Sequence, residues 1–131
     1  MKKTPLLLVS AGLAFLQSCS GLSPEAKEIV GNYYNPELSQ TEPVMELHSD
    51  ASCIVRAIKP GVLTYSVDGS WNVESDSIVF ILDPSSVRAE GDETFIGDIP
   101  MRYSRRIVEY SDFNLQLEQD GVVYLYQRRS E

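Results

Sequence analysis

Residues 62–74 form the longest alternating segment of the chain, and this segment restricts the possible folds more than any other. From residue 65 onward the odd positions hold tyrosine, valine, glycine, tryptophan and valine, whereas the even positions hold serine, aspartate, serine, asparagine and glutamate. Successive side chains of a β-strand point to opposite faces, so a period of two predicts a strand with one apolar and one polar face. Gly69 falls on the apolar face, where a missing side chain allows a long strand to bend around a closed sheet.

Further strands are expected on both sides of this segment. A turn at residues 74–77 leads into a return strand at 78–82, and Asp120-Gly121 is a strong hairpin signal between two alternating segments. The other expected strands cover residues 33–34, 44–48, 52–58, 94–99, 101–110, 113–118 and 122–127, with a loop at 85–92 and a short helix at 24–30. So many short strands in about 100 residues predict an all-β fold, either an antiparallel barrel or a strongly curved sandwich. The small barrel of about eight strands is preferred, because closure removes exposed strand edges.

The first eighteen residues have the pattern of a secretory signal. Lys2 and Lys3 form a basic start, and an apolar run follows from Pro5 to Leu16. A helix that spans a bilayer needs roughly 20 apolar residues, and this run is shorter. The pattern therefore predicts that residues 1–18 are removed, that residues 19–22 form a tether, and that residues 23–131 form a single domain.

The end of the signal resembles the lipobox of bacterial lipoproteins. Leu16, Gln17, Ser18 and Cys19 place a branched aliphatic residue three positions before a cysteine and a small residue directly before it, although Gln17 stands where a small residue is commoner. The resemblance implies that Cys19 carries acyl chains such as palmitate, and two or more chains anchor a protein stably. Ser20, rather than aspartate, resembles the signal for transfer to the outer membrane; which face of that membrane the domain occupies is left open.

Charge and cysteine content restrict the partners of the mature protein. Cleavage before Cys19 leaves 113 residues and removes two lysines but no acid, so the net charge changes from −8 to about −10. An acidic surface does not neutralise phosphates, so nucleic acid is not expected as a partner. If Cys19 is lipidated, Cys53 has no partner for an intramolecular disulfide, and its apolar neighbours favour a small buried residue over a reactive thiol.

A short helix that leads into Gly31-Asn32-Tyr33 on the first strand of a barrel resembles the lipocalin-like proteins. In that superfamily the aromatic residue is usually tryptophan and packs near the closed end of the barrel beside a basic residue from a late strand. The resemblance implies that Tyr33 takes this position, with Arg128 or Arg129 as the basic residue.

The sequence offers little catalytic chemistry. His48 is the only histidine, and it is expected at the solvent-facing end of a strand; no phosphate-binding, zinc-binding or calcium-loop motif is present. The acidic stretch at residues 90–93 lacks the spaced oxygen ligands of a calcium site. We therefore expect neither an enzyme nor a metal or other cofactor.

Two groups of residues are candidates for binding. Arg102, Arg105 and Arg106 form a basic cluster, and alternation places Arg102 and Arg106 on one face and Arg105 on the other. They either pair with acids such as Glu109 or bind an anion at the barrel mouth. The predicted binding residues, given an incompletely filled interior, are Tyr65, Trp71, Tyr103, Arg102 and Arg106. The function is then binding of a small apolar or amphipathic ligand, or, if the barrel is packed solid, a non-enzymatic interaction or assembly subunit of a cell-envelope complex.

Overall fold

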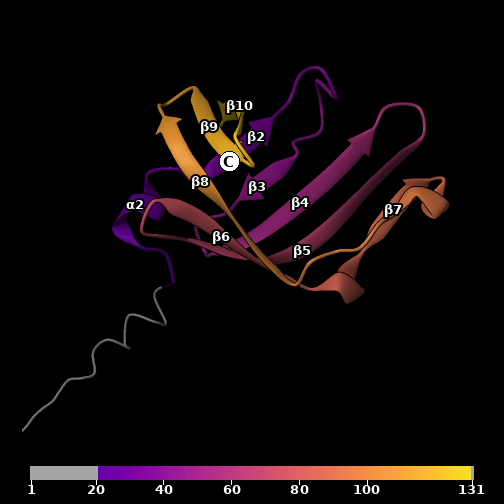
Figure 1. Cartoon of the computed structure of the whole chain (residues 1–131), viewed down its shortest axis with the longest axis horizontal. Coiled ribbons are helices and arrows are strands. Elements are labelled where there is room, and N and C mark those ends of the chain that lie inside the picture. The colour runs from indigo at the N-terminus through magenta and orange to yellow at the C-terminus, as the bar shows by residue number, and fades with distance from the viewer. Residues whose placement is uncertain (1–20, 131) are drawn as a thin grey trace, which may run out of the picture.

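Eight strands form a closed antiparallel barrel in the computed structural model, which describes residues 21–130 (Figure 1). The predicted signal peptide and Cys19 lie outside the described residues. The strands are β2 (Gly31–Tyr34), β3 (Met45–Leu47), β4 (Ser52–Lys59), β5 (Leu63–Glu74), β6 (Ser77–Leu82), β8 (Arg102–Tyr110), β9 (Asn114–Gln119) and β10 (Val122–Arg129). Each strand pairs with the next one in this list, and β10 pairs with β2 to complete the ring. The predicted all-β barrel is therefore confirmed.

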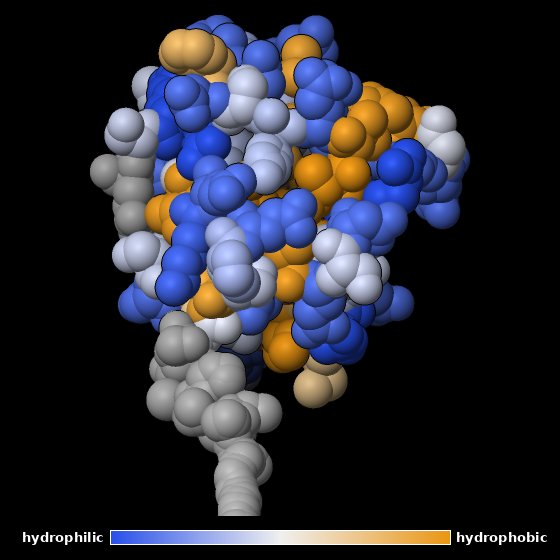
Figure 2. Space-filling view, turned by 90° about the vertical axis from the view of Figure 1, so that its left-hand side faces the viewer, coloured by the Kyte–Doolittle hydropathy of each residue, from blue (hydrophilic) through white to orange (hydrophobic). Residues whose placement is uncertain are grey.

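One end of the barrel is closed by a single-turn helix, α2 (Pro24–Lys27). Ser23 begins the helix as its N-cap, and its hydroxyl accepts a hydrogen bond from the backbone N–H of Ala26. Ala26 and Ile29 are fully buried against the barrel interior. Figure 2 shows the molecule from this side, where hydrophilic residues cover most of the surface and apolar residues show between them.

The hydrophobic core fills the half of the barrel next to α2. Its largest fully buried side chains include Tyr33, Phe80, Ile29, Leu47, Ile78 and Leu115. Trp71 is 3% exposed and belongs to the same cluster. This half of the interior is packed solid. The short helix predicted at residues 24–30 is confirmed at a shorter length, Pro24–Lys27.

Gly69 lies where β5 leaves one partner strand and continues along another. Residues 63–70 of β5 pair with β4, and residues 69–74 pair with β6. A Cβ atom built on Gly69 would lie 2.2 Å from the carbonyl oxygen of Ile81 on β6. The predicted role of Gly69 in curving the barrel thus has a steric basis, because no larger residue fits between these two backbones.

Two of the secondary-structure predictions are wrong, and both concern the segment between β6 and β8. Residues 94–99 form no strand: Glu93–Phe95 is a 3-10 helix, η2, started by Asp92, whose carboxylate accepts hydrogen bonds from the backbone N–H and hydroxyl of Thr94. The predicted loop at 85–92 contains a 3-10 turn, η1 (Pro84–Ser86), and a ninth strand, β7 (Arg88–Gly91), which pairs with the first half of β5. Residues 35–44 and 92–101 are the longest connections between the strands described here.

His48 also differs from its predicted position in solvent. Its side chain is 24% exposed and is held between two neighbours, with Nε2 3.1 Å from a carboxylate oxygen of Glu46 and Nδ1 3.0 Å from the hydroxyl of Ser52. Among residues 21–130, no three or more His, Cys, Asp or Glu side chains are grouped to hold a metal ion. In the same range, no helix is long and apolar enough to cross a membrane.

Candidate functional site

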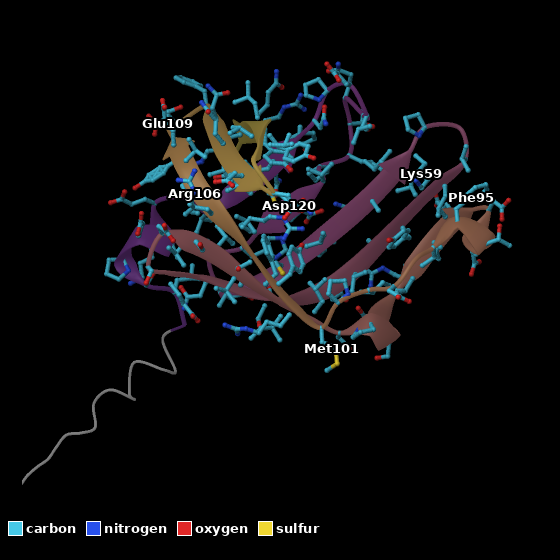
Figure 3. All side chains as sticks on the ribbon, in the orientation of Figure 1. Lys59, Phe95, Met101, Arg106, Glu109 and Asp120 are labelled. Carbon is cyan, nitrogen blue, oxygen red and sulfur yellow. The ribbon has the colours of Figure 1, made fainter. Side chains whose placement is uncertain are left out.

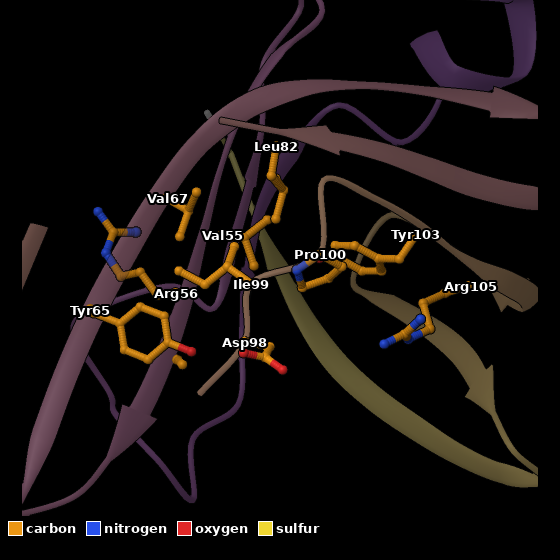
Figure 4. Close-up of a pocket in the computed structure, with 11 residues that line it drawn as sticks. Val55, Arg56, Tyr65, Val67, Leu82, Asp98, Ile99, Pro100, Tyr103 and Arg105 are labelled. Carbon is orange, nitrogen blue, oxygen red and sulfur yellow. The ribbon is translucent and has the colours of Figure 1, made fainter. Parts of the chain in front are cut away.

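The half of the barrel away from α2 contains a pocket of about 180 Å³ (Figure 4). Strands β4, β5, β6 and β8 provide its walls, and the segment that enters β8 provides its rim. Its lining residues are Val55, Arg56, Ala57, Tyr65, Val67, Leu82, Asp98, Ile99, Pro100, Tyr103 and Arg105. The interior is therefore packed next to α2 and hollow at the other end. An eight-stranded barrel can be filled completely by side chains or can hold one small ligand, and this barrel lies between these two cases.

The apolar wall of the pocket follows from strand alternation. Val55 lies opposite Val67 in the β4–β5 pair, and Ala57 lies opposite Tyr65. Leu82 on β6 and Ile99 on the rim complete this wall. The side chains on the strands point inward because every second residue of each strand faces the barrel interior. The wall can hold the apolar part of a ligand.

The polar part of the pocket is centred on β8. Tyr103 stacks on Phe80, with ring centroids 4.7 Å apart, and the guanidinium carbon of Arg105 lies 4.7 Å from the centre of the Tyr103 ring. Burial raises the pKa of the Tyr103 hydroxyl, and the nearby Arg105 charge acts in the opposite direction. Tyr126 on β10 behaves in the same way, since burial raises its pKa and Arg105 lowers it. Both hydroxyls are therefore neutral donors at physiological pH.

Arg105 is the charged residue that this arrangement leaves available to a ligand. One of its terminal nitrogens donates to the carbonyl oxygen of Ser104 at 2.8 Å, and no carboxylate among residues 21–130 lies within 4 Å of its guanidinium. Arg56, the other arginine of the lining, is paired with Glu46 and also donates to the carbonyl oxygen of Pro43. Asp98 lies at the exposed rim.

The five predicted binding residues are not brought together in one place. Tyr65 and Tyr103 line the pocket. Trp71 is in the packed half, where its indole N–H donates to the carbonyl oxygen of His48 at 3.0 Å. Arg102 and Arg106 lie on the outer face of β8, in ion pairs with Glu74 and Glu118 rather than with the predicted Glu109; Arg106 and Glu109 are labelled in Figure 3.

Arg105 belonged to the predicted basic cluster but was not among the five predicted binding residues, although the sequence contained the signal for it. Residues 103 and 105 share a face of a strand, and residues 102 and 106 share the other. Tyr103 together with Arg102 and Arg106 therefore cannot face a single pocket. Once Tyr103 is placed inside, alternation makes Arg105 the inward-facing arginine.

Comparisons with known proteins give one similar structure. No protein-family model and no curated protein matches the chain. The crystal structure of a lipocalin-like protein from Bacteroides uniformis is similar with a TM-score of 0.38 and 16% sequence identity, over 76% of this chain and 93% of that chain.

Proposed function

We propose that the domain binds a small amphipathic anion, with the apolar part of the ligand against the β4–β5 wall and its anionic group at Arg105. The observation that supports this proposal is the half-buried Arg105 at the edge of an apolar pocket, with its guanidinium over the Tyr103 ring and with no carboxylate partner among residues 21–130. Arginine binds carboxylates through two parallel hydrogen bonds, so a carboxylate is the preferred anion.

The size of the pocket restricts the ligand. Pockets that enclose a whole drug-sized ligand measure about 300–1,000 Å³. At about 180 Å³ this pocket holds a short ligand, or the first part of a longer one whose remainder leaves through the open end of the barrel. A medium-chain carboxylate fits both descriptions.

Binding of octanoate and of 1-octanol to the purified domain tests the proposal, because the two probes share an apolar chain and differ in charge. A charged hydrogen bond contributes about 1.5–3 kcal/mol, so octanoate should bind at least about tenfold more tightly than 1-octanol. Arg105→Gln should remove that preference, whereas Arg102→Gln, on the outer face of the same strand, should retain it. Equal affinities for the two probes, or an Arg105→Gln variant that still prefers octanoate, would disprove the assignment.

A substitution at Asp98 should change the affinity for octanoate in the opposite direction. Its carboxylate stands at the rim of the same pocket, where it repels an incoming anion. We expect Asp98→Asn to increase the affinity for octanoate and to leave that for 1-octanol unchanged. An unspecific loss of folding cannot produce this result, since it would lower both affinities.

We further propose that the domain is held at the outer membrane through acyl chains on Cys19, as the lipobox predicts. Gly21 is fixed at the closed end of the barrel, where its carbonyl oxygen accepts a hydrogen bond of 2.7 Å from the side-chain amide of Asn72. Residues 19 and 20 can extend at most about 7 Å from this point. An anchor on Cys19 would therefore hold the α2 end next to the lipid and direct the pocket away from it.

Fractionation of cells that express the full chain tests the anchor. The parent protein should fractionate with membranes and resist extraction by salt, because lipid anchoring does not depend on charge. Cys19→Ala should be released, whereas Cys53→Ala, a change at the other cysteine, should not be. A Cys19→Ala protein that remains in the membrane fraction after its signal peptide has been removed would contradict the anchor.

A second candidate function is a non-enzymatic subunit of an envelope complex. The observation that favours it is the edge of β10 at residues 122–126, where no strand of residues 21–130 pairs on the side away from β9. The bare domain would then bind neither octanoate nor 1-octanol.

A further inference from the structure

Most of strand β10 has a partner on one side only. Residues 122–127 pair with β9, whereas β2 pairs only with Gln127, Arg128 and Arg129. Figure 1 shows β10 at the side of the barrel where the ring closes. Among the described residues, no strand lies against residues 122–126 on the side away from β9.

The turn that precedes β10 determines which backbone groups are free. Asp120 and Gly121 both have positive φ, of 52° and 83°, as a two-residue type I′ hairpin requires. Gln119 and Val122 next to this turn form a hydrogen-bonded pair, so in the alternating ladder Val123 and Leu125 direct their N–H and C=O groups away from β9. These four groups form the free edge of β10.

The free edge lacks the features that usually protect such strands. Val122, Val123, Tyr124 and Leu125 are 51%, 50%, 44% and 58% exposed. Residues 122–126 contain no charge and no proline, and the pairing with β9 has no bulge. Folded proteins normally place lysine, proline, a bulge or a covering loop at an exposed edge, because an unprotected edge pairs with another chain.

We infer that the free edge of β10 pairs with the same edge of a second copy of this chain, in antiparallel orientation, with the two Tyr124 residues opposite each other. In this register Val123 of each copy lies opposite Leu125 of the other. The free N–H and C=O groups of both residues are then satisfied by four hydrogen bonds across the two-fold axis.

The distribution of charge favours a second copy. Acidic Asp120 lies before the free edge, and basic Arg128 and Arg129 lie after it; Asp120 at the turn is labelled in Figure 3. Antiparallel pairing directs the acidic end of each copy toward the basic end of the other. The chain carries a net charge of −8, and the uncharged edge allows two such chains to approach with little repulsion.

Such a dimer would also close the side of the barrel next to the pocket. On β4, residues 57–59 pair only with β5, because the pairing of β4 with β3 ends at Val55. The wall between β4 and β10 is therefore incomplete at the open end, and a second copy along β10 would extend the sheet there. A pairing of five residues buries less than the roughly 1,000 Å² of a stable interface, so the expected dimer is weak and is favoured by confinement to a membrane.

Cross-linking of the full chain in membranes of expressing cells tests this inference. Residues opposite each other in a pair without hydrogen bonds have Cα atoms about 4.5 Å apart, within disulfide range. Mild oxidation of Tyr124→Cys should give a disulfide dimer at twice the 14.6 kDa of the chain or, after removal of the signal, of its mature form. Val122→Cys, whose counterpart would be Tyr126, should give at least about fivefold less dimer. The parent chain shows how much dimer forms through its own cysteines, Cys19 and Cys53.

A second test introduces a charge at the free edge of β10. Val123→Lys in the Tyr124→Cys background should abolish the dimer, whereas Val108→Lys, at a partly exposed valine of β8, should retain it. Three outcomes would overturn the inference: no more dimer from Tyr124→Cys than from the parent chain, equal dimer from Val122→Cys, or adducts only to proteins of other mass. None of these readouts depends on Arg105, so they are independent of the proposed ligand site.

Discussion

Arg128 on β10 lies directly opposite Tyr33 on β2, and its guanidinium donates to the carbonyl oxygens of Glu28, Val30 and Ser111. The Tyr33 hydroxyl in turn donates to the carbonyl oxygen of Ile29 at 2.7 Å. The two side chains therefore satisfy four backbone carbonyls that the short helix and the β8–β9 turn would otherwise leave unpaired. Arg128, rather than Arg129, is the basic residue that the sequence placed beside Tyr33; Arg129 stacks on Tyr34 at 3.9 Å.

Loss of Arg128 should open the closed end of the barrel. We expect Arg128→Met to lower the free energy of unfolding by about 2–3 kcal/mol, because the methionine retains most of the apolar stem but none of the donors. Arg129→Met, which loses one exposed carbonyl contact and a cation–π contact, should cost about 1 kcal/mol or less. Urea unfolding followed by tryptophan fluorescence measures both; similar losses for the two variants would contradict a specific role for Arg128.

The stability of the domain should fall in alkaline solution. Burial raises the pKa of Tyr33 from 10.0 to about 12 and that of Cys53 from 9.0 to about 12. Both groups lose their protons more readily in the unfolded chain, so their contribution is complete below about pH 9 and is lost as the pH rises toward 12. Each group that titrates only when unfolded lowers the free energy of unfolding by about 1.4 kcal/mol per pH unit.

Variants separate the two contributions to this pH dependence. Cys53→Ala should reduce the loss of stability between pH 9 and 10, where the Cys53 thiol ionises in the unfolded chain and Tyr33 does not. Tyr33→Phe should act mainly above pH 10. Urea unfolding at pH 8, 9.5 and 11 gives the slopes, and an identical pH dependence in the parent chain and both variants would refute the assignment.

A methyl group at Gly69 should be far more harmful than one at Gly97. The added Cβ at Gly69 would lie 2.2 Å from the Ile81 carbonyl oxygen and 2.9 Å from a methyl group of Leu82, whereas nothing lies within 4 Å at Gly97. We expect Gly69→Ala to lower the free energy of unfolding by about 2–4 kcal/mol and Gly97→Ala to change it by less than about 0.5 kcal/mol. Thermal unfolding measures both changes, and a Gly69→Ala domain as stable as its parent would exclude close packing of β5 on β6.

The fold could be predicted from the sequence because the barrel strands have a simple period. Alternation alone predicted the inward faces of β5 and β9, and the Asp120-Gly121 turn predicted β10 as the hairpin partner of β9. Strand β7 could not be predicted in this way, because Arg88, Ala89, Glu90 and Gly91 have no apolar alternation. They form a strand only because the first half of β5 offers an unpaired edge.

For the candidate site, the sequence predicted which residues face the barrel interior but not how far along the barrel axis they lie. Alternation states whether a residue faces the interior, and both Tyr65 and Trp71 do so. It does not state how far along the barrel axis a residue lies, and Trp71 lies six positions further along β5 than Tyr65. Trp71 therefore lies in the core although it shares a face with Tyr65.

The division of the barrel into a packed half and a hollow half has a consequence for how such a protein can change over generations. Most of the stability resides around Tyr33, Phe80 and Ile78, whereas the residues that would select a ligand stand at the other end. Substitutions that most often destabilise a domain are those in its core, and the lining residues at the open end lie outside that core, except Val67 and Leu82. The pocket can therefore acquire a new specificity at little risk to folding.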